Sequence, residues 1–131
     1  MQNLWRKKRV EKIGVAIPNW KVEQWKLIVG FLKDSGFQVE EFPPESDDVF
    51  SSQFDVFIGD FFSVEKWKGK FKSKAGFLCV VEFDCYCANS WMERSFYQFF
   101  PPPKNAFLTY PFGFVQIRDK IEKMVTTLKF F

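Results

Sequence analysis

Short apolar runs alternate with segments of helical spacing along almost the whole chain, and this alternation constrains the fold more than any other feature. The runs are short enough to be strands rather than helices. We expect five strands, at Lys12–Ile17, Phe37–Phe42, Phe54–Gly59, Phe77–Phe83 and Ala106–Tyr110. Strands that alternate with helices predict a parallel sheet with right-handed crossovers and helices on both faces. Their continuous apolar character agrees, because strands of such a sheet are buried on both sides.

Amphipathic segments fill the gaps between these runs. The clearest is Phe114–Leu128, whose apolar residues step by three and four positions. The first, Trp20–Ser35, can be capped by Asn19 and ended by Gly36. We expect the other helices at about Glu45–Ser52, from Ser63 to Phe71, and from Asn89 or Ser90 to Phe100.

The bulk composition is that of one globular domain with an excess of aromatic residues. The chain has 131 residues, 47% hydrophobic and 27% charged. We assign residues 12–131 to a single domain and residues 1–11 to a basic N-terminal arm. Aromatic residues make up 21% of the chain, including 19 Phe, and a domain of this size cannot easily bury them all. We therefore expect an exposed apolar patch and a protein partner.

The use of histidine and cysteine narrows the chemistry. The chain has no His, which removes the usual general base, so we expect a binding protein rather than an enzyme. Cys79, Cys85 and Cys87 are odd in number and lack Cys-x-x-Cys spacing, which is typical of reduced thiols in the cytoplasm. For Cys79, which lies inside an apolar run, a buried structural role is favoured over binding of a soft metal. We find no signal peptide and no apolar run long enough to span a bilayer, and expect no membrane partner.

The third apolar run ends in an acid, in the stretch "FDVFIGD" that closes with Asp60. Ligands of open parallel sheets bind beyond the carboxyl ends of the strands. Asp60 therefore lies at the edge where chemistry would occur. Two interpretations stay open, and the first is favoured: a residual acid, solvated or hydrogen-bonded, or a ligand-binding or phosphoacceptor residue. The other strand ends on this edge are Pro18-Asn19, the Glu82–Asp84 region and Tyr110-Pro111.

Three motifs, in this order along the chain, resemble the receiver domains of bacterial response regulators, which are CheY-like. Asn19 matches an asparagine that often follows the acidic pair after strand one, and "DVFIGD" matches the strand-three pattern that closes in the phosphoacceptor aspartate. Tyr110-Pro111-Phe112 stands where the family has Lys-Pro-Phe. The resemblance covers roughly Lys12 to Leu128. It implies a flavodoxin-like, doubly wound sheet of five strands in the order 2-1-3-4-5, a stand-alone signalling domain, and a cis Tyr110–Pro111 bond.

The chain departs from that family where the chemistry is done. Ile17 and Pro18 stand in place of the acidic pair that holds magnesium, and Tyr110 in place of the lysine that contacts the phosphoryl group. The hydroxyl residue expected after strand four is not evident in the Glu82–Asp84 region. We therefore expect no metal and no cofactor, and a phosphoacceptor-equivalent Asp60 that is not efficiently phosphorylated. The vestigial site would comprise Pro18, Asn19, Asp84, Tyr110 and Pro111.

The same resemblance implies a protein-binding surface on the fourth helix, the fifth strand and the fifth helix. Through it the domain would bind another protein or a second copy of itself. Phenylalanine doublets cannot easily place both rings in one core, so we expect Phe62, Phe100 and the edge of the last helix to form exposed apolar surface. The predicted interaction surface comprises Trp91, Phe96, Phe100, Tyr110 and Phe114.

Two alternatives stay open. The first is a flavodoxin-like domain that binds a nucleotide, a flavin or another phosphate compound at the same edge, although "IPNWKV" after the first strand is neither Gly-rich nor Ser/Thr-rich. The second concerns the lysines of "EKWKGKFKSK", which are interleaved with Trp67 and Phe71. An ordinary solvated helix face is favoured there over a nucleic-acid site.

Overall fold

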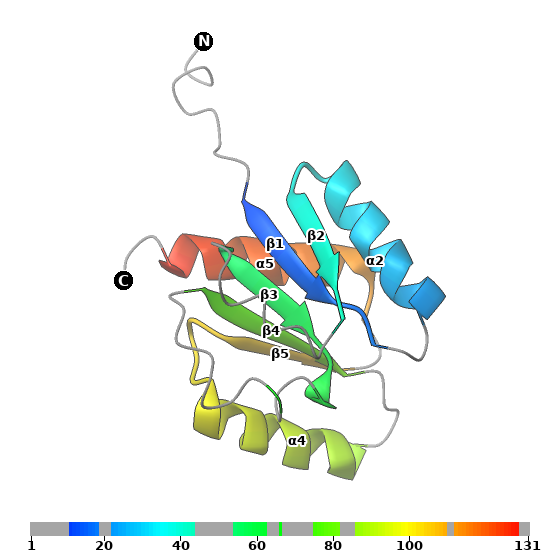
Figure 1. Ribbon diagram of the computed structural model, residues 1–131. Helices are drawn as coiled ribbons and strands as arrows, with labels where there is room; N and C mark the ends of the chain where they lie inside the picture. Colours follow the sequence, from blue (N-terminus) through cyan, green and yellow to red (C-terminus); the bar gives the residue numbers. More distant parts are fainter. Residues whose placement is uncertain are drawn as a thin grey trace.

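Five parallel strands form one sheet in the order β2-β1-β3-β4-β5, as the resemblance implies (Figure 1). The computed structural model describes residues 11–18, 22–43, 54–62, 66, 75–81, 86–109 and 112–128, without the side chains of 86–89 and 127–128. Because neighbouring strands are parallel throughout, every carboxyl end lies on the same edge of the sheet. The strands are β1 (Lys12–Ala16), β2 (Gln38–Phe42), β3 (Val56–Gly59), β4 (Gly76–Val81) and β5 (Ala106–Thr109).

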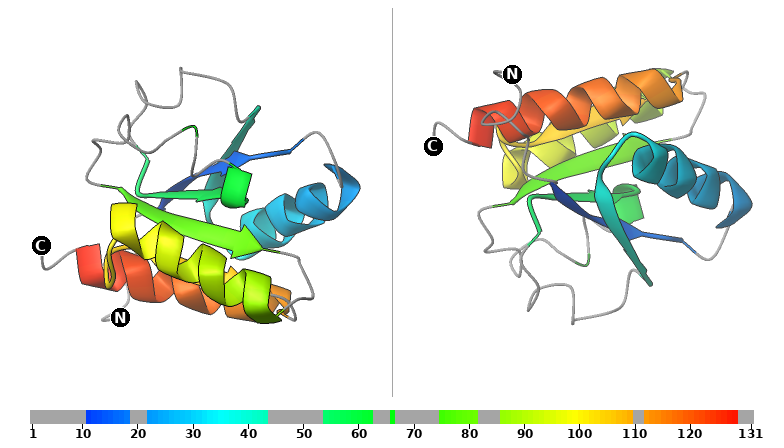
Figure 2. Two further views of the ribbon diagram at one scale, coloured as in Figure 1. Left: turned by 90° about the horizontal axis from the view of Figure 1, so that it is seen from below. Right: turned by 90° about the horizontal axis from the view of Figure 1, so that it is seen from above.

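Helices cover both faces of this sheet, which confirms the doubly wound arrangement. Helices α2 (Val22–Asp34) and α5 (Phe114–Leu128) pack on one face, and α4 (Tyr86–Phe99) packs on the other (Figure 2). The last helix has the predicted bounds, whereas α4 begins three residues before Asn89. The predicted helices at about Glu45–Ser52 and from Ser63 to Phe71 fall on residues that are mostly or wholly outside the described ranges. None of the described helices has the length and apolar content to cross a membrane.

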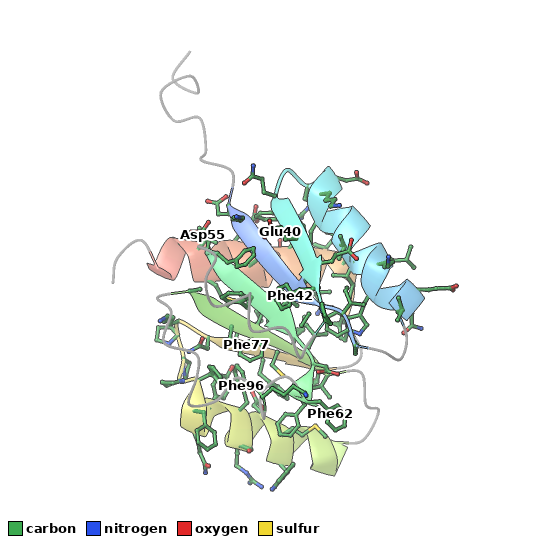
Figure 3. The ribbon with its side chains drawn as sticks, viewed as in Figure 1. Glu40, Phe42, Asp55, Phe62, Phe77 and Phe96 are labelled. Carbon is green, nitrogen blue, oxygen red and sulfur yellow. The ribbon has the colours of Figure 1, made fainter. Side chains whose placement is uncertain are left out.

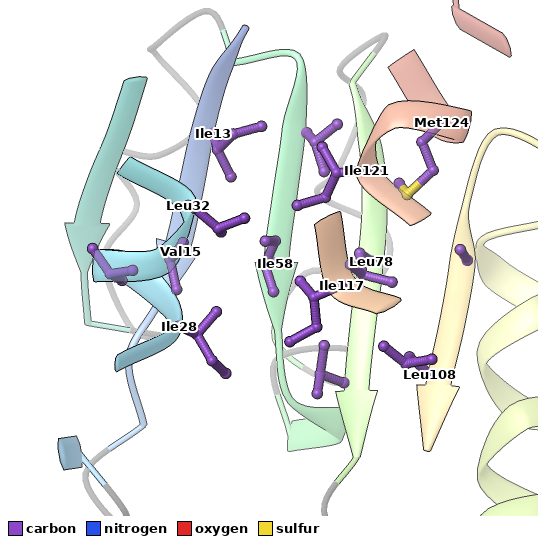
Figure 4. Close-up of a cluster of buried hydrophobic side chains, with 14 of the residues drawn as sticks. Ile13, Val15, Ile28, Leu32, Ile58, Leu78, Leu108, Ile117, Ile121 and Met124 are labelled. Carbon is purple, nitrogen blue, oxygen red and sulfur yellow. The ribbon is translucent and has the colours of Figure 1, made fainter. Parts of the chain in front are cut away.

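The side of the sheet under α2 and α5 holds an aliphatic cluster (Figure 4). Successive side chains of a strand point to opposite faces, so Val56 and Ile58 of β3 join this cluster and Phe57 between them joins the other. Leu78 follows the same rule in β4, and Ile117 and Ile121 reach it from α5. Figure 3 shows Phe77 of β4 and Phe96 of α4 on the opposite side, where the second cluster is rich in phenylalanine.

Local signals at the ends of two helices behave as their residues predict. Gly36 adopts a φ of 100°, which L-residues avoid, and the Phe37 N–H donates to the Leu32 carbonyl while the Gly36 N–H donates to Lys33. This is a Schellman cap, and it confirms the predicted role of Gly36. At the start of α5, the Gln116 side chain accepts a hydrogen bond of 2.7 Å from the Gly113 N–H, as in one half of a capping box.

Polar side chains tie the amino edge of the sheet together, away from the predicted site. Asp55 accepts a hydrogen bond of 2.9 Å from the Lys12 N–H through Oδ2, and its own N–H donates to the Lys12 carbonyl. Asn105 accepts a hydrogen bond of 2.8 Å from the Phe77 N–H and donates to the Pro101 carbonyl. Glu11, which we assigned to the basic arm, is buried, and its carbonyl accepts from the Gln38 N–H. The first three strands and the end of α4 are thus anchored at this edge.

Candidate functional site

The candidate site lies at the carboxyl edge of the sheet, where β1 and β3 are neighbours. Pro18 follows β1 and Asp60 follows β3, and both are buried. These are the two described members of the predicted site. Asn19, Asp84, Tyr110 and Pro111 lie outside the described residues, as does the predicted cis bond before Pro111; a cis peptide bond is present between Pro102 and Pro103.

Asp60 is buried, so it is not the solvated residual acid that was one of the interpretations of this residue. Its exposed fraction is 5%. It directly follows Gly59, which pairs with Cys79 across the β3–β4 ladder. Burial raises the pKa of the Cys79 thiol well above its ordinary value, and the nearby Asp60 carboxylate raises it further. The Asp60 carboxylate, which follows β3, thus acts electrostatically on the Cys79 thiol inside the neighbouring strand β4.

The described residues of this edge do not fit a magnesium site. Magnesium takes an octahedral shell of hard oxygen ligands, normally with carboxylates among them. Pro18 offers no side-chain oxygen, and a thiol such as that of Cys79 is a soft ligand. Within the described ranges, no three His, Cys, Asp or Glu side chains come close enough together to hold a metal ion. Of the two described residues of the predicted site, Asp60 is thus the one that could bring a hard anionic oxygen.

Two residues of the predicted interaction surface are in the core instead. Phe96 is fully buried and Phe100 nearly so, so the prediction that Phe100 is exposed is wrong and neither ring can offer surface to a partner. Both rings pack against Phe77, with centroids 5.4 and 4.8 Å away and planes close to perpendicular. The spacing of four residues from Met92 to Phe96 to Phe100 is the helical signal that could have predicted this.

The two exposed residues of that predicted surface point to different neighbours. Trp91 of α4 lies against Phe61, which follows Asp60, with ring centroids 5.7 Å apart. Phe114 of α5 lies against Phe31 of α2, with centroids 5.3 Å apart. These ring contacts lie on α2 and at the end of β3, not on β5. Tyr110, which stands between Trp91 and Phe114 in the sequence, is outside the described residues.

Tyr97 marks the side of α4 that does face β5. Burial raises the pKa of the Tyr97 phenol most, the Glu93 carboxylate adds to this, and a hydrogen bond with the backbone of Phe107 opposes it. Phe107 belongs to β5. Since Trp91 and Tyr97 are six positions apart, their side chains leave the helix about 120° from each other, so Trp91 lies on a different side of α4 from Tyr97.

Phenylalanine doublets divide as expected at two places. Phe61 is buried and Phe62 exposed, which confirms the prediction for Phe62, and Phe99 is exposed beside the buried Phe100. Lys66, the described lysine of the "EKWKGKFKSK" stretch, is exposed. Trp67, Phe71 and the other lysines of this stretch lie outside the described residues.

Comparison with solved structures identifies the fold as that of response regulator receiver domains. A crystal structure of NtrX from Brucella abortus matches 93% of this chain with a TM-score of 0.72 at 15% sequence identity, and the match covers 28% of NtrX. A signal receiver domain from Bermanella marisrubri matches 89% of this chain and 99% of its own length, with a TM-score of 0.66 at 16% identity. This chain therefore spans a whole receiver domain but under a third of NtrX.

A flavo di-iron protein from Thermotoga maritima shares the same layout more loosely. It matches 92% of this chain and 36% of its own length, with a TM-score of 0.55 at 14% identity. At such identities the likeness concerns the fold. No protein-family model and no curated protein matches the sequence. The chain thus has a receiver-like, CheY-like fold, and its activity has to be argued from its own residues.

Proposed function

We propose that this chain is a receiver-like signalling domain that acts by binding another protein and is not phosphorylated in the usual magnesium-dependent way. The observation that carries the proposal is a buried Asp60 after β3 with a proline, Pro18, after the neighbouring strand β1. Asp60 would hold the position of a phosphoacceptor, and among the described residues of the predicted site, Pro18 cannot support its chemistry.

Phosphoryl transfer depends mainly on positioning and on neutralising the charge of the transferred group. Proline has neither a side-chain oxygen for a metal nor a backbone N–H for a phosphate oxygen. The carboxylate of Asp60 is also nearly closed to solvent, so an attacking geometry would require the surrounding residues to open. These features support a site that keeps its acid for structure or binding and has lost the transfer reaction.

The test is exposure of the pure protein to acetyl phosphate and magnesium, followed by intact-mass measurement. We expect no gain of a phosphoryl group in the wild type or in Asp60→Asn. Stoichiometric labelling of the wild type that disappears in Asp60→Asn would show the proposal to be wrong. A bona fide receiver domain labelled in parallel provides the positive control.

The protein-binding part of the proposal rests on exposed aromatic side chains. Trp91 and Phe114 remain candidates from the predicted surface because both are exposed, whereas Phe96 and Phe100 drop out. The free, buried Cys79 thiol supports a reducing compartment, and we place the domain in the cytoplasm. Neither point depends on whether Asp60 accepts a phosphoryl group.

The rival, a small-ligand domain of flavodoxin-like shape, finds less support. A phosphate loop after β1 would use backbone N–H groups at the start of the following helix, and Pro18 removes one such donor. Differential scanning fluorimetry with ATP and with FMN separates the two. A thermal shift of several degrees, lost in Asp60→Ala, would favour the rival.

A further inference from the structure

Two large aromatic side chains are more than half exposed beside the candidate site. Phe62, two residues after Asp60, and Trp91 of α4 each have an exposed fraction of 57%. The buried Phe61 lies against Trp91, with ring centroids 5.7 Å apart and planes inclined at 55°. Phe61 thus joins the end of β3 to α4 through Trp91, and Phe62 follows it directly in the chain; we call these three residues the aromatic corner (Figure 3 labels Phe62).

Single exposed apolar side chains are ordinary on protein surfaces, but this corner has the make-up of a binding hot spot. Tryptophan and other aromatic residues supply most of the affinity at protein interfaces when they are anchored on a buried base. Phe61 provides that base, because it is itself 8% exposed. A partner that covers Phe62 and Trp91 would bury two rings that the domain leaves in water.

Two exposed cations, Arg94 and Lys66, lie close in the sequence to the exposed rings, while the Asp60 carboxylate next to Phe61 is buried. Arg94 is exposed and lies three residues after Trp91, so the two are neighbours on the surface of α4. Lys66, four residues after Phe62, is also exposed. Among the described residues neither cation takes part in an ion pair. Glu93, the nearest acid in the sequence, acts instead on Tyr97, toward β5.

From these observations we propose that the Phe61–Phe62–Trp91 corner docks an acidic segment of a partner protein that packs apolar side chains on the two exposed rings. Acidic groups on either side of the apolar anchor would meet Arg94 and Lys66. The inference rests on the proposed function, for which it supplies a surface and a partner chemistry. This surface is distinct from the side of α4 that faces β5.

The test is selection of binders from a random peptide library displayed on phage, using the immobilised wild-type domain. The selected peptides are then synthesised with a fluorescent label and titrated by anisotropy. We expect enriched sequences with Leu, Phe or Trp anchors flanked by Asp and Glu. Trp91→Ala and Phe62→Ala should each weaken binding about tenfold or more, and Arg94→Glu should weaken it several-fold and reduce its salt dependence.

Leu27→Ala is the matched control, because Leu27 on α2 is 62% exposed and lies on the other face of the sheet. It should leave the affinity unchanged. Arg94→Glu keeps the aromatic packing intact and so separates loss of binding from loss of folding. Equal circular dichroism melts for all variants complete the comparison.

Four results would overturn the inference. The first is that no peptide is enriched, and the second is that enriched peptides bind the Phe62→Ala/Trp91→Ala double variant with the same affinity as the wild type. The third is that a single-stranded oligonucleotide binds in a Trp91-dependent way. The fourth is that the domain self-associates and that Trp91→Ala abolishes this. The labelling experiment with acetyl phosphate stands apart from these. Phosphorylation of Asp60 would refute the proposed chemistry and leave peptide docking intact, whereas failure of docking in an unlabelled protein would refute this inference alone.

Discussion

The two faces of the sheet are built from different side chains. Among the described residues, sixteen buried ones form a cluster under α2 and α5 in which Trp25 is the one aromatic residue. On the side of α4, eleven described residues form the second buried cluster, and seven of them are phenylalanine. Both sets come largely from the same strands, because alternate residues of a strand point to opposite faces.

The difference shows that, among the described elements, one helix with large side chains can cover a face of the sheet for which smaller side chains need two helices. Two helices cover the aliphatic side, whereas α4 is the one helix that the described residues place over the aromatic side. Phenylalanine buries more area per residue than valine or isoleucine and adds edge-to-face contacts. Phe96, for example, has ring contacts with four aromatic neighbours, which are Phe77, Tyr97, Phe100 and Phe107.

The faces also differ in where polar groups lie. On the aliphatic side, the buried indole N–H of Trp25 has no hydrogen-bond partner within the part of the chain that the structure describes, and the described cluster holds no ionisable side chain. The aromatic side holds the Cys79 thiol, next to the Asp60 carboxylate. The candidate site and the exposed aromatic corner are both on or beside this second face.

Truncation of one matched residue in each helix should show the largest effect. Phe96 on α4 and Ile121 on α5 are both fully buried. Phe96→Ala is expected to lower the free energy of unfolding by about 3–5 kcal/mol, and Ile121→Ala by about 1 kcal/mol less, since the phenylalanine leaves the larger cavity and removes four ring contacts. Urea unfolding followed by circular dichroism measures both. An Ile121→Ala cost equal to or above that of Phe96→Ala would remove the contrast between the faces.

The buried amide of Asn105 should be next in size. It accepts from the Phe77 N–H and donates to the Pro101 carbonyl, just after α4, so it fastens the aromatic face at the amino edge. Asn105→Ala is expected to cost about 1–3 kcal/mol, because the Phe77 N–H loses its acceptor in a buried position. Ser35→Ala, which removes an exposed bond to the Phe31 carbonyl, is the control and should change the melting temperature little. Equal effects of the two substitutions would contradict the argument from burial.

The Cys79 thiol should give the smallest effect, seen in the pH dependence of stability. Its pKa is raised in the folded state, so above its ordinary pKa the unfolded chain releases a proton that the folded chain retains. The stabilisation is therefore complete below that pKa and declines as the pH rises toward the folded value. Relative to Cys79→Ala, the wild type should lose up to about 1.4 kcal/mol per pH unit between about pH 8 and pH 10.

Urea midpoints measured across this range for both proteins provide the check. Lys104 has a pKa lowered by burial, and this contribution is common to the two proteins and cancels in the difference. The raised pKa of Tyr97 is caused mainly by burial and owes its smallest contribution to Cys79 itself, so that small part belongs to the measured effect of Cys79. Parallel curves for the wild type and Cys79→Ala would show that Cys79 is not protected on the aromatic face.

Much of the fold was predictable because its signals are local. Apolar runs marked all five strands, and the step of three and four residues marked α5 with its bounds. The glycine at position 36 predicted the C-terminal cap of α2, because such a cap commonly needs a residue with positive φ, which glycine adopts without strain. Helix α4 was placed three residues late at its start, because its first turn lacks a strong capping signal and boundaries are set partly by packing.

The sequence predicted the position of the candidate site in the fold, but it did not predict how deeply Asp60 is buried or which residues surround it. The βα order places Asp60 at the carboxyl edge, which the structure confirms, but its burial beside Cys79 depends on the register of β3 with β4. Phe96 and Phe100 were expected on the surface; their four-residue spacing could have indicated a buried stripe, and their contacts with Phe77 show what that stripe packs against. Likewise, the contact between Phe61 and Trp91 joins residues thirty positions apart in the sequence, so no local pattern could predict it.

By itself, then, the sequence determined a parallel, doubly wound sheet and its edge of possible function, and it shows Ile17, Pro18 and Tyr110 where the resemblance would place acidic and basic residues. These follow from periodicity, chain order and the chemistry of single residues. Only the tertiary structure decided which phenylalanines are core and which are surface, and that Asp60 is enclosed. Burial is a property of contacts between segments distant in the chain, and a residue's own side chain does not specify which segments will cover it.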